Sequence, residues 1–267
     1  MLTKKSIGIA FAAAMALGAS GAALATPISV NGVQWDSSSP FDLTIQSLNL
    51  RETSVAAVGD TLTGYGQIGS INGNTSFCSG CDLTFTFTYT VQSISGDQVV
   101  FNNGTFQFYT QAAGSFSFGD PTSVGGTPWV TLSGHTAPQT GFADLGQLYA
   151  TVTGSVAQPG SQSGGFGLVD ATGGPAASKL DSNFWDDSIG GFADFQLQSS
   201  FSFAPASTCP SVTTNLDDIC AYPIQGNGSL TGRTAVPEPG EVGLLGLGLG
   251  VLGFFMWRRR KESTGRE

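Results

Sequence analysis

The sequence predicts an all-β protein whose central body is an antiparallel β-sandwich of jelly-roll type. Residues 26–235 are rich in Gly, Ser, Thr and Phe and poor in Lys and Glu, which disfavours helices and favours strands joined by glycine turns. Several segments alternate apolar and polar residues with the period of a strand, and none keeps a helical period. Many short strands between turns are typical of a sandwich or a barrel, and we favour the sandwich.

Residues 1–25 have the three parts of a secretory signal peptide. Two lysines precede an apolar, alanine-rich run over residues 7–17, and Ala23 and Ala25 form an A-x-A cleavage site before Thr26. We expect a signal helix that signal peptidase removes after Ala25. The alternative, a permanent N-terminal anchor, needs a longer apolar stretch.

The clearest strand spans residues 82–92, where large residues alternate strictly with threonines. Because successive side chains of a strand point to opposite faces, the large residues should share one face. They are Leu83, Phe85, Phe87, Tyr89 and Val91.

A hairpin is expected at Asn102-Asn103-Gly104, between β-rich runs at 99–101 and 105–109, because Asn and Gly adopt positive φ easily. The glycine-rich and proline-containing segments 158–165 and 171–179 predict loops, either between two domains or within one. Further strands are expected at 41–49, 61–68, 115–118, 129–132, 147–156 and 193–203.

The central body is strongly acidic. Residues 26–235 contain three basic and fifteen acidic side chains, a net charge of −12. Such a body has no cationic surface for phosphates, so nucleic acid is excluded as a partner. An acidic body can attract divalent cations. One segment is a weak candidate for a calcium site, because its oxygen ligands are suitably spaced, although it lacks the glycine and the terminal glutamate of an EF-hand. Its residues are Asp181, Asn183, Asp186 and Asp187, and no other cofactor or metal is expected.

Four cysteines in an exported chain predict two disulfides. We favour the local pairs Cys78–Cys81 and Cys209–Cys220, and the two crossed pairings remain alternatives. The C-x-x-C pair could also be a redox centre or half of a zinc site, but it runs into a strand, whereas redox motifs of this kind open a helix.

No catalytic residue is predicted. His135 is the single histidine, and no G-x-S-x-G nucleophile elbow accompanies it. Asp186 and Asp187 lie beside Trp185, yet neighbouring carboxylates do not make a glycosidase pair. We therefore expect a protein that is not an enzyme, with a secreted hydrolase as a remote alternative. A third possibility is a carbohydrate-binding module that stacks sugars on aromatic side chains. Its tryptophans would be Trp35, Trp129 and Trp185.

The C-terminal end combines three features in a fixed order. A Pro-Glu-Pro motif is followed by an apolar run of sixteen residues at 242–257, which makes a helix of about 24 Å, somewhat short for a bilayer core. Four adjacent bases follow and should stop in the cytoplasm, leaving residues 262–267 inside and the body outside the inner membrane. The motif is Pro237, Glu238 and Pro239, and the bases are Arg258, Arg259, Arg260 and Lys261.

This order resembles the PEP-CTERM sorting tail of Gram-negative, exopolysaccharide-producing bacteria, and the resemblance covers residues 236–261. It implies that exosortase, a membrane-embedded cysteine transpeptidase, recognises Pro237, Glu238 and Pro239 as substrate. It also implies an inner-membrane precursor that faces the periplasm and matures to a cell-surface or extracellular protein. The expected setting is exopolysaccharide, in a biofilm or floc.

Overall fold

The computed structural model describes residues 27–38, 43–135 and 148–235. The signal peptide, with its expected helix and cleavage site, lies outside the described residues, as do the sorting motif, the apolar span and the basic cluster. All described residues but the last belong to one compact unit, Met1–Thr234. Within the described part of the chain, no helix is both long and apolar enough to cross a membrane.

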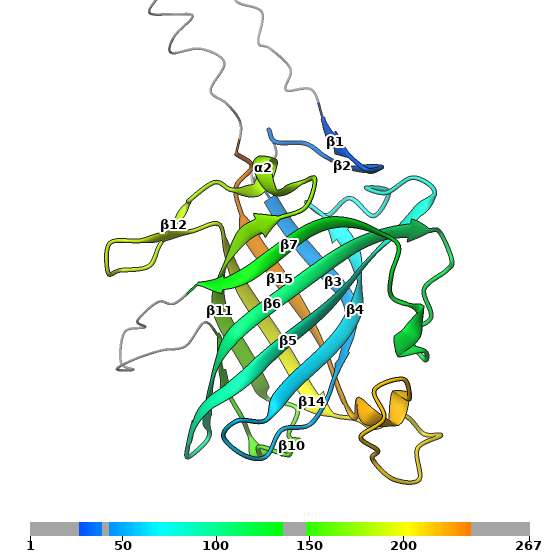
Figure 1. The fold of residues 1–267 in the computed structure, drawn as a ribbon, viewed down its shortest axis with the longest axis vertical. Helices are drawn as coiled ribbons and strands as arrows, with labels where there is room; N and C mark the ends of the chain where they lie inside the picture. Colours follow the sequence, from blue (N-terminus) through cyan, green and yellow to red (C-terminus); the bar gives the residue numbers. More distant parts are fainter. Residues whose placement is uncertain (1–26, 39–42, 136–147, 236–267) are drawn as a thin grey trace, which may run out of the picture. The chain divides into compact units, whose positions relative to one another are not determined.

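The large strands form one antiparallel sheet that closes on itself (Figure 1). Each strand pairs with its neighbour along the chain, and the sheet closes because β14 bonds both β15 and β11. The eight main strands are β3 (Leu43–Glu52), β4 (Thr61–Ile71), β5 (Cys81–Ser95), β6 (Gln98–Ala112), β7 (Thr127–His135), β11 (Ser163–Gly173), β14 (Phe195–Phe203) and β15 (Ile224–Gly232).

The predicted all-β antiparallel class is confirmed. The body is sandwich-like, since β4 to β7 form one layer in Figure 1 and β3, β15, β14 and β11 form the layer behind it. Both layers belong to the same closed sheet, however, and its order follows the chain instead of the crossed connections of a jelly roll. The described body is thus an up-and-down barrel.

One wall position is shared by two strands. β7 and the short strand β8 (Leu148–Thr151) both run antiparallel to β6 and β11. On β11, Leu168 pairs with His135 and its neighbour Gly167 pairs with Leu148. The two strands therefore continue one line of pairing, although twelve residues separate them in the sequence.

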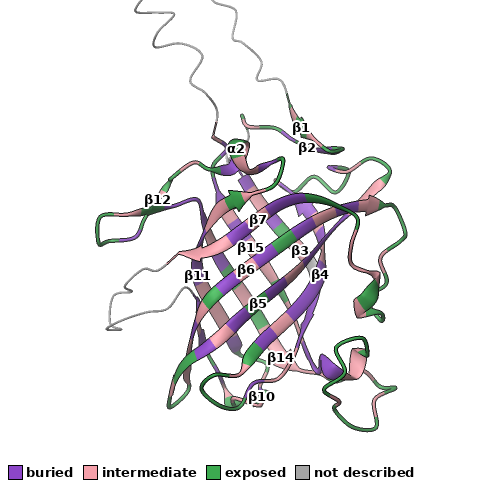
Figure 2. Cartoon of the chain, viewed as in Figure 1, coloured by how far each residue is buried: buried purple, intermediate pink, exposed green. Residues whose placement is uncertain are grey.

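The alternation predicted for β5 is confirmed. Its five large residues are at most 5% exposed and lie in the main core, and Figure 2 shows buried and less buried residues alternating along β5 and β6. Two inward positions of β4 are glycines, because a Cβ on Gly64 or Gly66 would collide with the ring of Phe87 or Phe85. Bare backbone on one strand thus makes room for an aromatic ring on the next.

The hairpin expected at Asn102-Asn103-Gly104 is wrong, because these residues lie inside β6. They form a bulge instead: Thr90 pairs with Asn102 and Thr88 with Thr105, so the β6 side holds one extra residue. Asn103 does adopt positive φ, at 52°. The chain reverses between β5 and β6 at Gly96-Asp97, where the notably turn-prone pair Gly-Asp follows Ser95.

Other predicted boundaries also need correction. Residues 115–118 form no strand, and residues 147–156 divide into β8 and a separate two-residue strand, β9. The predicted loop 158–165 overlaps β10 and the start of β11, and the predicted loop 171–179 overlaps the end of β11 and the helix α2. The small elements are β1 (Ile28–Val30), β2 (Val33–Trp35), η1 (Pro121–Ser123), β9 (Gly154–Ser155), β10 (Gln158–Pro159), α2 (Ala177–Leu180), β12 (Trp185–Asp186), β13 (Phe192–Ala193) and η2 (Ile219–Ala221).

One end of the barrel is closed by the β1–β2 hairpin and α2, whose apolar residues join the main core. Trp35 and Trp129 meet edge to face there, with ring centroids 6.0 Å apart. The Trp35 indole donates to Thr234 Oγ1 at 3.0 Å, and the Trp129 indole donates to the Val30 carbonyl at 3.2 Å. Because both tryptophans are buried, they are unavailable for stacking on a sugar.

Asp194 holds the segment after α2 against β11. Its carboxylate is 2% exposed and accepts three backbone N–H groups. Ala171 donates to Oδ2 at 2.7 Å, while Ser182 and Asn183 donate to Oδ1 at 2.6 and 2.7 Å. One buried side chain therefore accepts hydrogen bonds from two separate stretches of backbone, near the end of β11 and after α2.

Candidate functional site

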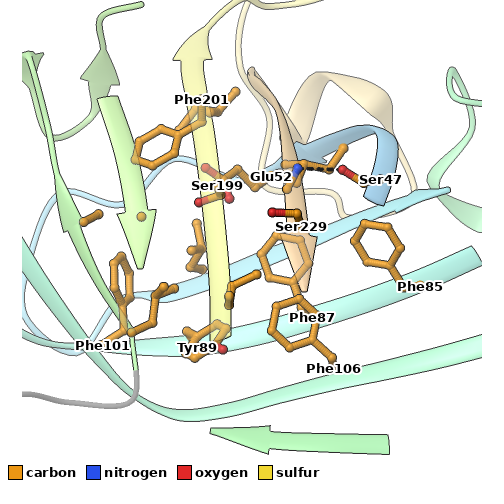
Figure 3. Close-up of a pocket in the computed structure, with 18 of the residues that line it drawn as sticks. Ser47, Glu52, Phe85, Phe87, Tyr89, Phe101, Phe106, Ser199, Phe201 and Ser229 are labelled. Atoms are coloured by element: carbon orange, nitrogen blue, oxygen red, sulfur yellow. Dashed lines mark hydrogen bonds between the residues drawn. The ribbon is translucent and has the colours of Figure 1, made fainter. Parts of the chain in front are cut away.

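The barrel encloses an apolar cavity (Figure 3). The volume open to the centres of water-sized molecules inside it is about 80 Å³. Large apolar side chains from β3, β4, β5, β6, β14 and β15 line it, among them Phe85, Phe87, Phe101 and Phe106. An eight-stranded closed sheet has an interior that side chains can fill or that can hold one small ligand, and this one is incompletely filled.

The space exists because small residues lie in one row across the wall. Ala150 on β8 pairs with Gly165 on β11, Gly165 pairs with Ser199 on β14, and Ser199 pairs with Gly228 on β15. All four line the cavity. Four neighbouring strands thus contribute almost no side-chain volume at this level, and the aromatic rings of β5 pack on the rings of β6 instead.

Glu52 is the carboxylic acid of the cavity lining. It is 7% exposed, and burial raises the pKa of its carboxyl to about 8, with no compensating charge or hydrogen bond among the described residues. The adjacent Arg51 points to the outer face, where it lies over the Phe118 ring and donates to the Tyr222 carbonyl at 3.0 Å. At neutral pH, Glu52 is therefore a neutral carboxylic acid that can donate a hydrogen bond.

The Tyr89 hydroxyl is the second polar group of the lining. Tyr89 is 1% exposed, and its Oη is buried without a hydrogen-bond partner among the described residues. Burial also raises the pKa of its phenol, which stays protonated. Its ring lies against Gly104, where a Cβ would collide with it. The bulge in β6 is therefore what seats this ring.

Three serines complete the polar lining: Ser47, Ser199 and Ser229. Ser47 Oγ already accepts the Gly228 N–H at 2.6 Å, the bond drawn in Figure 3. The cavity therefore offers neutral hydrogen-bonding groups in an apolar surrounding, which suits binding of an apolar molecule. No motif or spacing in the sequence marks these residues as a site.

His135, the residue on which a hydrolase would depend, lies outside this cavity. Its Nδ1 is 2.7 Å from Asp170 Oδ2 and its Nε2 is 3.2 Å from Asp187 Oδ2. Burial disfavours the charged imidazolium, but the hydrogen bonds and charges of the two carboxylates outweigh it and raise the pKa of His135. With both ring nitrogens held, the imidazole joins the end of β7 to β11 and to the β12–β13 turn.

The four calcium candidates do not converge. Asp181 accepts from the Asn183 side chain at 2.9 Å, Asp186 accepts the Ser188 N–H at 2.7 Å, and Asp187 accepts the backbone of the turn at Ile189 and Gly191. Within residues 27–38, 43–135 and 148–235, no group of three or more His, Cys, Asp or Glu side chains is arranged to hold a metal ion.

The disulfide prediction is confirmed. Cys78 bonds Cys81 just before β5, and Cys209 bonds Cys220 across the loop between β14 and β15. The crossed pairings and the zinc site are therefore wrong for these four cysteines. The loop held by the second bridge covers the outer face of β4, where Tyr65 packs edge to face on Tyr222 at 4.9 Å.

Fold and site together define a closed antiparallel barrel with an internal apolar cavity and two disulfides. Comparison with known families adds the tail: residues 235–261 match the PEP-CTERM protein-sorting motif. The recognised resemblance is thereby confirmed, and the chain has the C-terminal signal of an exported exosortase substrate. No curated protein and no solved structure matches the chain.

Proposed function

We propose that this chain is a non-enzymatic protein of the cell surface or extracellular matrix, associated with exopolysaccharide in a biofilm or floc. The match of residues 235–261 to the sorting motif carries the proposal, because it makes the chain a substrate for exosortase. Pro237, Glu238 and Pro239 are the residues that exosortase would recognise. Arg258, Arg259, Arg260 and Lys261 would hold the precursor's end in the cytoplasm until processing.

The body supports an extracellular role through its covalent and sheet structure. All four of its cysteines are paired, as suits an oxidising compartment. The closed sheet pairs the edges that an open sheet would expose, which favours solubility at high local concentration. The net charge of −12 acts in the same direction.

The absence of enzymatic activity is proposed from the groups that catalysis would use. His135, the single histidine, has both nitrogens bound to carboxylates, so neither is free to take a proton from a nucleophile. Asp186 and Asp187 accept hydrogen bonds from the backbone of their own turn. These arrangements fit a structural role for all three side chains.

A carbohydrate-binding module is the alternative, and it has weaker support. Of its three tryptophans, Trp185 alone is partly exposed, and its indole donates to the Thr231 carbonyl at 2.7 Å. The neighbouring Phe184 ring is tilted 69° to it, so the two do not form a flat platform. Binding of the purified cell polysaccharide, lost on replacing Phe184, Trp185 and Phe192 together, would favour this alternative.

The test of sorting is mass spectrometry of the mature C-terminus in cells with and without exosortase. We expect the tail to be removed or altered near residues 235–261 only when exosortase is present, and the body to be found in the matrix fraction. Changing Pro237 and Pro239 to alanine should mimic loss of the enzyme, while the same change at Pro205 is the control. An intact end at Glu267 in both strains would contradict the proposal.

A further inference from the structure

The cavity lining holds two buried groups that can form hydrogen bonds, the Tyr89 hydroxyl and the Glu52 carboxyl. The Tyr89 hydroxyl has no hydrogen-bond partner among the described residues, and the Glu52 carboxyl is buried without a compensating charge. A buried polar group without a partner lowers stability relative to an apolar side chain of the same shape, because it loses its hydrogen bonds to water. Buried polar groups in native proteins are nearly always satisfied, so both require an explanation.

These two groups belong to the lining of the same cavity. Glu52 pairs with Gly64, which in turn pairs with Phe87, and Tyr89 follows Phe87 at the next inward position of β5. Gly64 leaves the intervening strand without a side chain at this level. A molecule seated between the aromatic rings and the small-residue row (Ala150, Gly165, Ser199 and Gly228) lies in the cavity that both residues line.

We propose that this cavity binds one uncharged, mainly apolar small molecule whose hydrogen-bonding oxygen meets Glu52 and Tyr89, of the class of medium-chain alcohols and ketones. The neutral carboxyl of Glu52 donates to such an oxygen, and the Tyr89 hydroxyl donates or accepts. The apolar part occupies the space beside the small-residue row. Ligand binding thus satisfies the groups that the empty barrel leaves unpaired.

Other ligand classes fit less well. A sugar presents a hydroxyl on almost every carbon, whereas only five of the lining residues have polar side chains. A carboxylate or phosphate would bury its charge in an apolar lining that contains no Lys, Arg or His side chain. A hydrophobic amine could ionise Glu52 and pair with it, and this class is separated from the proposed one by the experiment.

The experiment measures displacement of a fluorescent apolar probe, 1-aminoanthracene, from the full chain purified in mild detergent, with a detergent blank subtracted. We expect one saturable site per chain and displacement by octan-1-ol. Octanoate should not displace the probe, and octan-1-ol should bind more tightly than octylamine. Absence of a saturable site, or a preference for octylamine or octanoate, would overturn the proposal.

Two serines of β14 provide matched variants. Ser199 faces the cavity between Gly165 and Gly228, and Ser200 is exposed on the outer face. Ser199→Phe should fill the space and weaken probe binding by about tenfold or more, which corresponds to ~1.4 kcal/mol. Ser200→Phe should leave binding unchanged. Ala150→Leu is a second filling variant with the same expected loss, and equal binding in the filled and control variants would refute the site.

Tyr89→Phe separates a binding role from a packing role. Because it removes only an unpaired hydroxyl, the unfolding midpoint of the ligand-free chain should stay the same or rise. The preference for octan-1-ol over octane should fall, and it should fall further with Glu52→Leu. If both variants keep the wild-type preference, Glu52 and Tyr89 do not contact the ligand. Failure of these tests leaves the sorting proposal untouched, since that depends on the tail.

Discussion

Replacing Asp194 by alanine removes the acceptor for three backbone N–H groups at once, those of Ala171, Ser182 and Asn183. An unsatisfied buried donor costs about 1–3 kcal/mol. Two offsets lower the total. Ser182 and Asn183 are partly or fully exposed, so water can reach their N–H groups, and alanine also removes the desolvation that raises the pKa of Asp194. We expect a loss of roughly 2–5 kcal/mol, a large share of the ~5–15 kcal/mol typical of a domain.

Asp194→Asn gives a graded comparison. An amide oxygen can keep either the two bonds made by Oδ1 or the single bond made by Oδ2, and its NH₂ then faces an N–H. Its loss should lie between zero and that of alanine. Asp217→Ala removes one exposed carboxylate and should change stability by less than about 0.5 kcal/mol.

The assay is urea unfolding of the full chain followed by tryptophan fluorescence, with the free energy taken from the midpoint and slope. We expect the urea midpoint to decrease in the order wild type, Asp194→Asn, Asp194→Ala. If Asp194→Ala were within 0.5 kcal/mol of the Asp217→Ala control, the three bonds would not be holding the segment after α2, and the argument would fail.

Three further outcomes are expected. Burial raises the folded pKa of Glu52 to about 8 from an ordinary value near 4.5, so the contribution of this group to stability is full below pH 4.5 and falls as pH rises towards 8. In Glu52→Gln, the urea midpoint should no longer fall with pH between 4.5 and 8 for this reason. Because the pKa of His135 is raised in the folded state, its contribution to stability is present below about pH 6.5 and is lost as pH rises through the folded pKa. In thermal melts, His135→Ala should therefore destabilise the protein more at pH 6 than at pH 9. Gly64→Val should cost about 1–3 kcal/mol by colliding with the Phe87 ring, whereas Gly125→Ala, which faces open space, should be nearly neutral by urea unfolding.

The strands that could be predicted from the sequence are those in which large and polar residues alternate within the strand itself. β5 was identified because its inward residues are all large and its outward residues nearly all threonine. β11 and β15 were missed because glycine and serine occupy many of their positions, including the inward Gly165 and Gly228. Those positions are small because neighbouring strands approach there, and pairing partners are not visible in a single segment. Closure of the sheet could not be predicted for the same reason, because it depends on the pairing of β14 with β11.

The candidate site could not be predicted from the sequence because the pairing register of β3 changes within the strand. On β3, Leu43 and Ile45 point inward at odd positions, but irregular pairing around Ser47 shifts the pattern, so Leu50 and Glu52 point inward at even positions. Alternation read across the whole segment therefore gives no warning that Glu52 is interior. The sorting tail, in contrast, consists of adjacent residues read by another protein, and such motifs are recognisable without knowledge of the fold.

The shared wall position of β7 and β8 has a consequence for how this chain can change in length. His135 and Leu148 pair with adjacent residues of β11, so the wall would keep its register if they were joined directly. The barrel consequently imposes no length on the stretch between them. An insertion or deletion there leaves every strand pairing intact, which makes this seam the natural place for related chains to diverge and for a foreign peptide to be displayed.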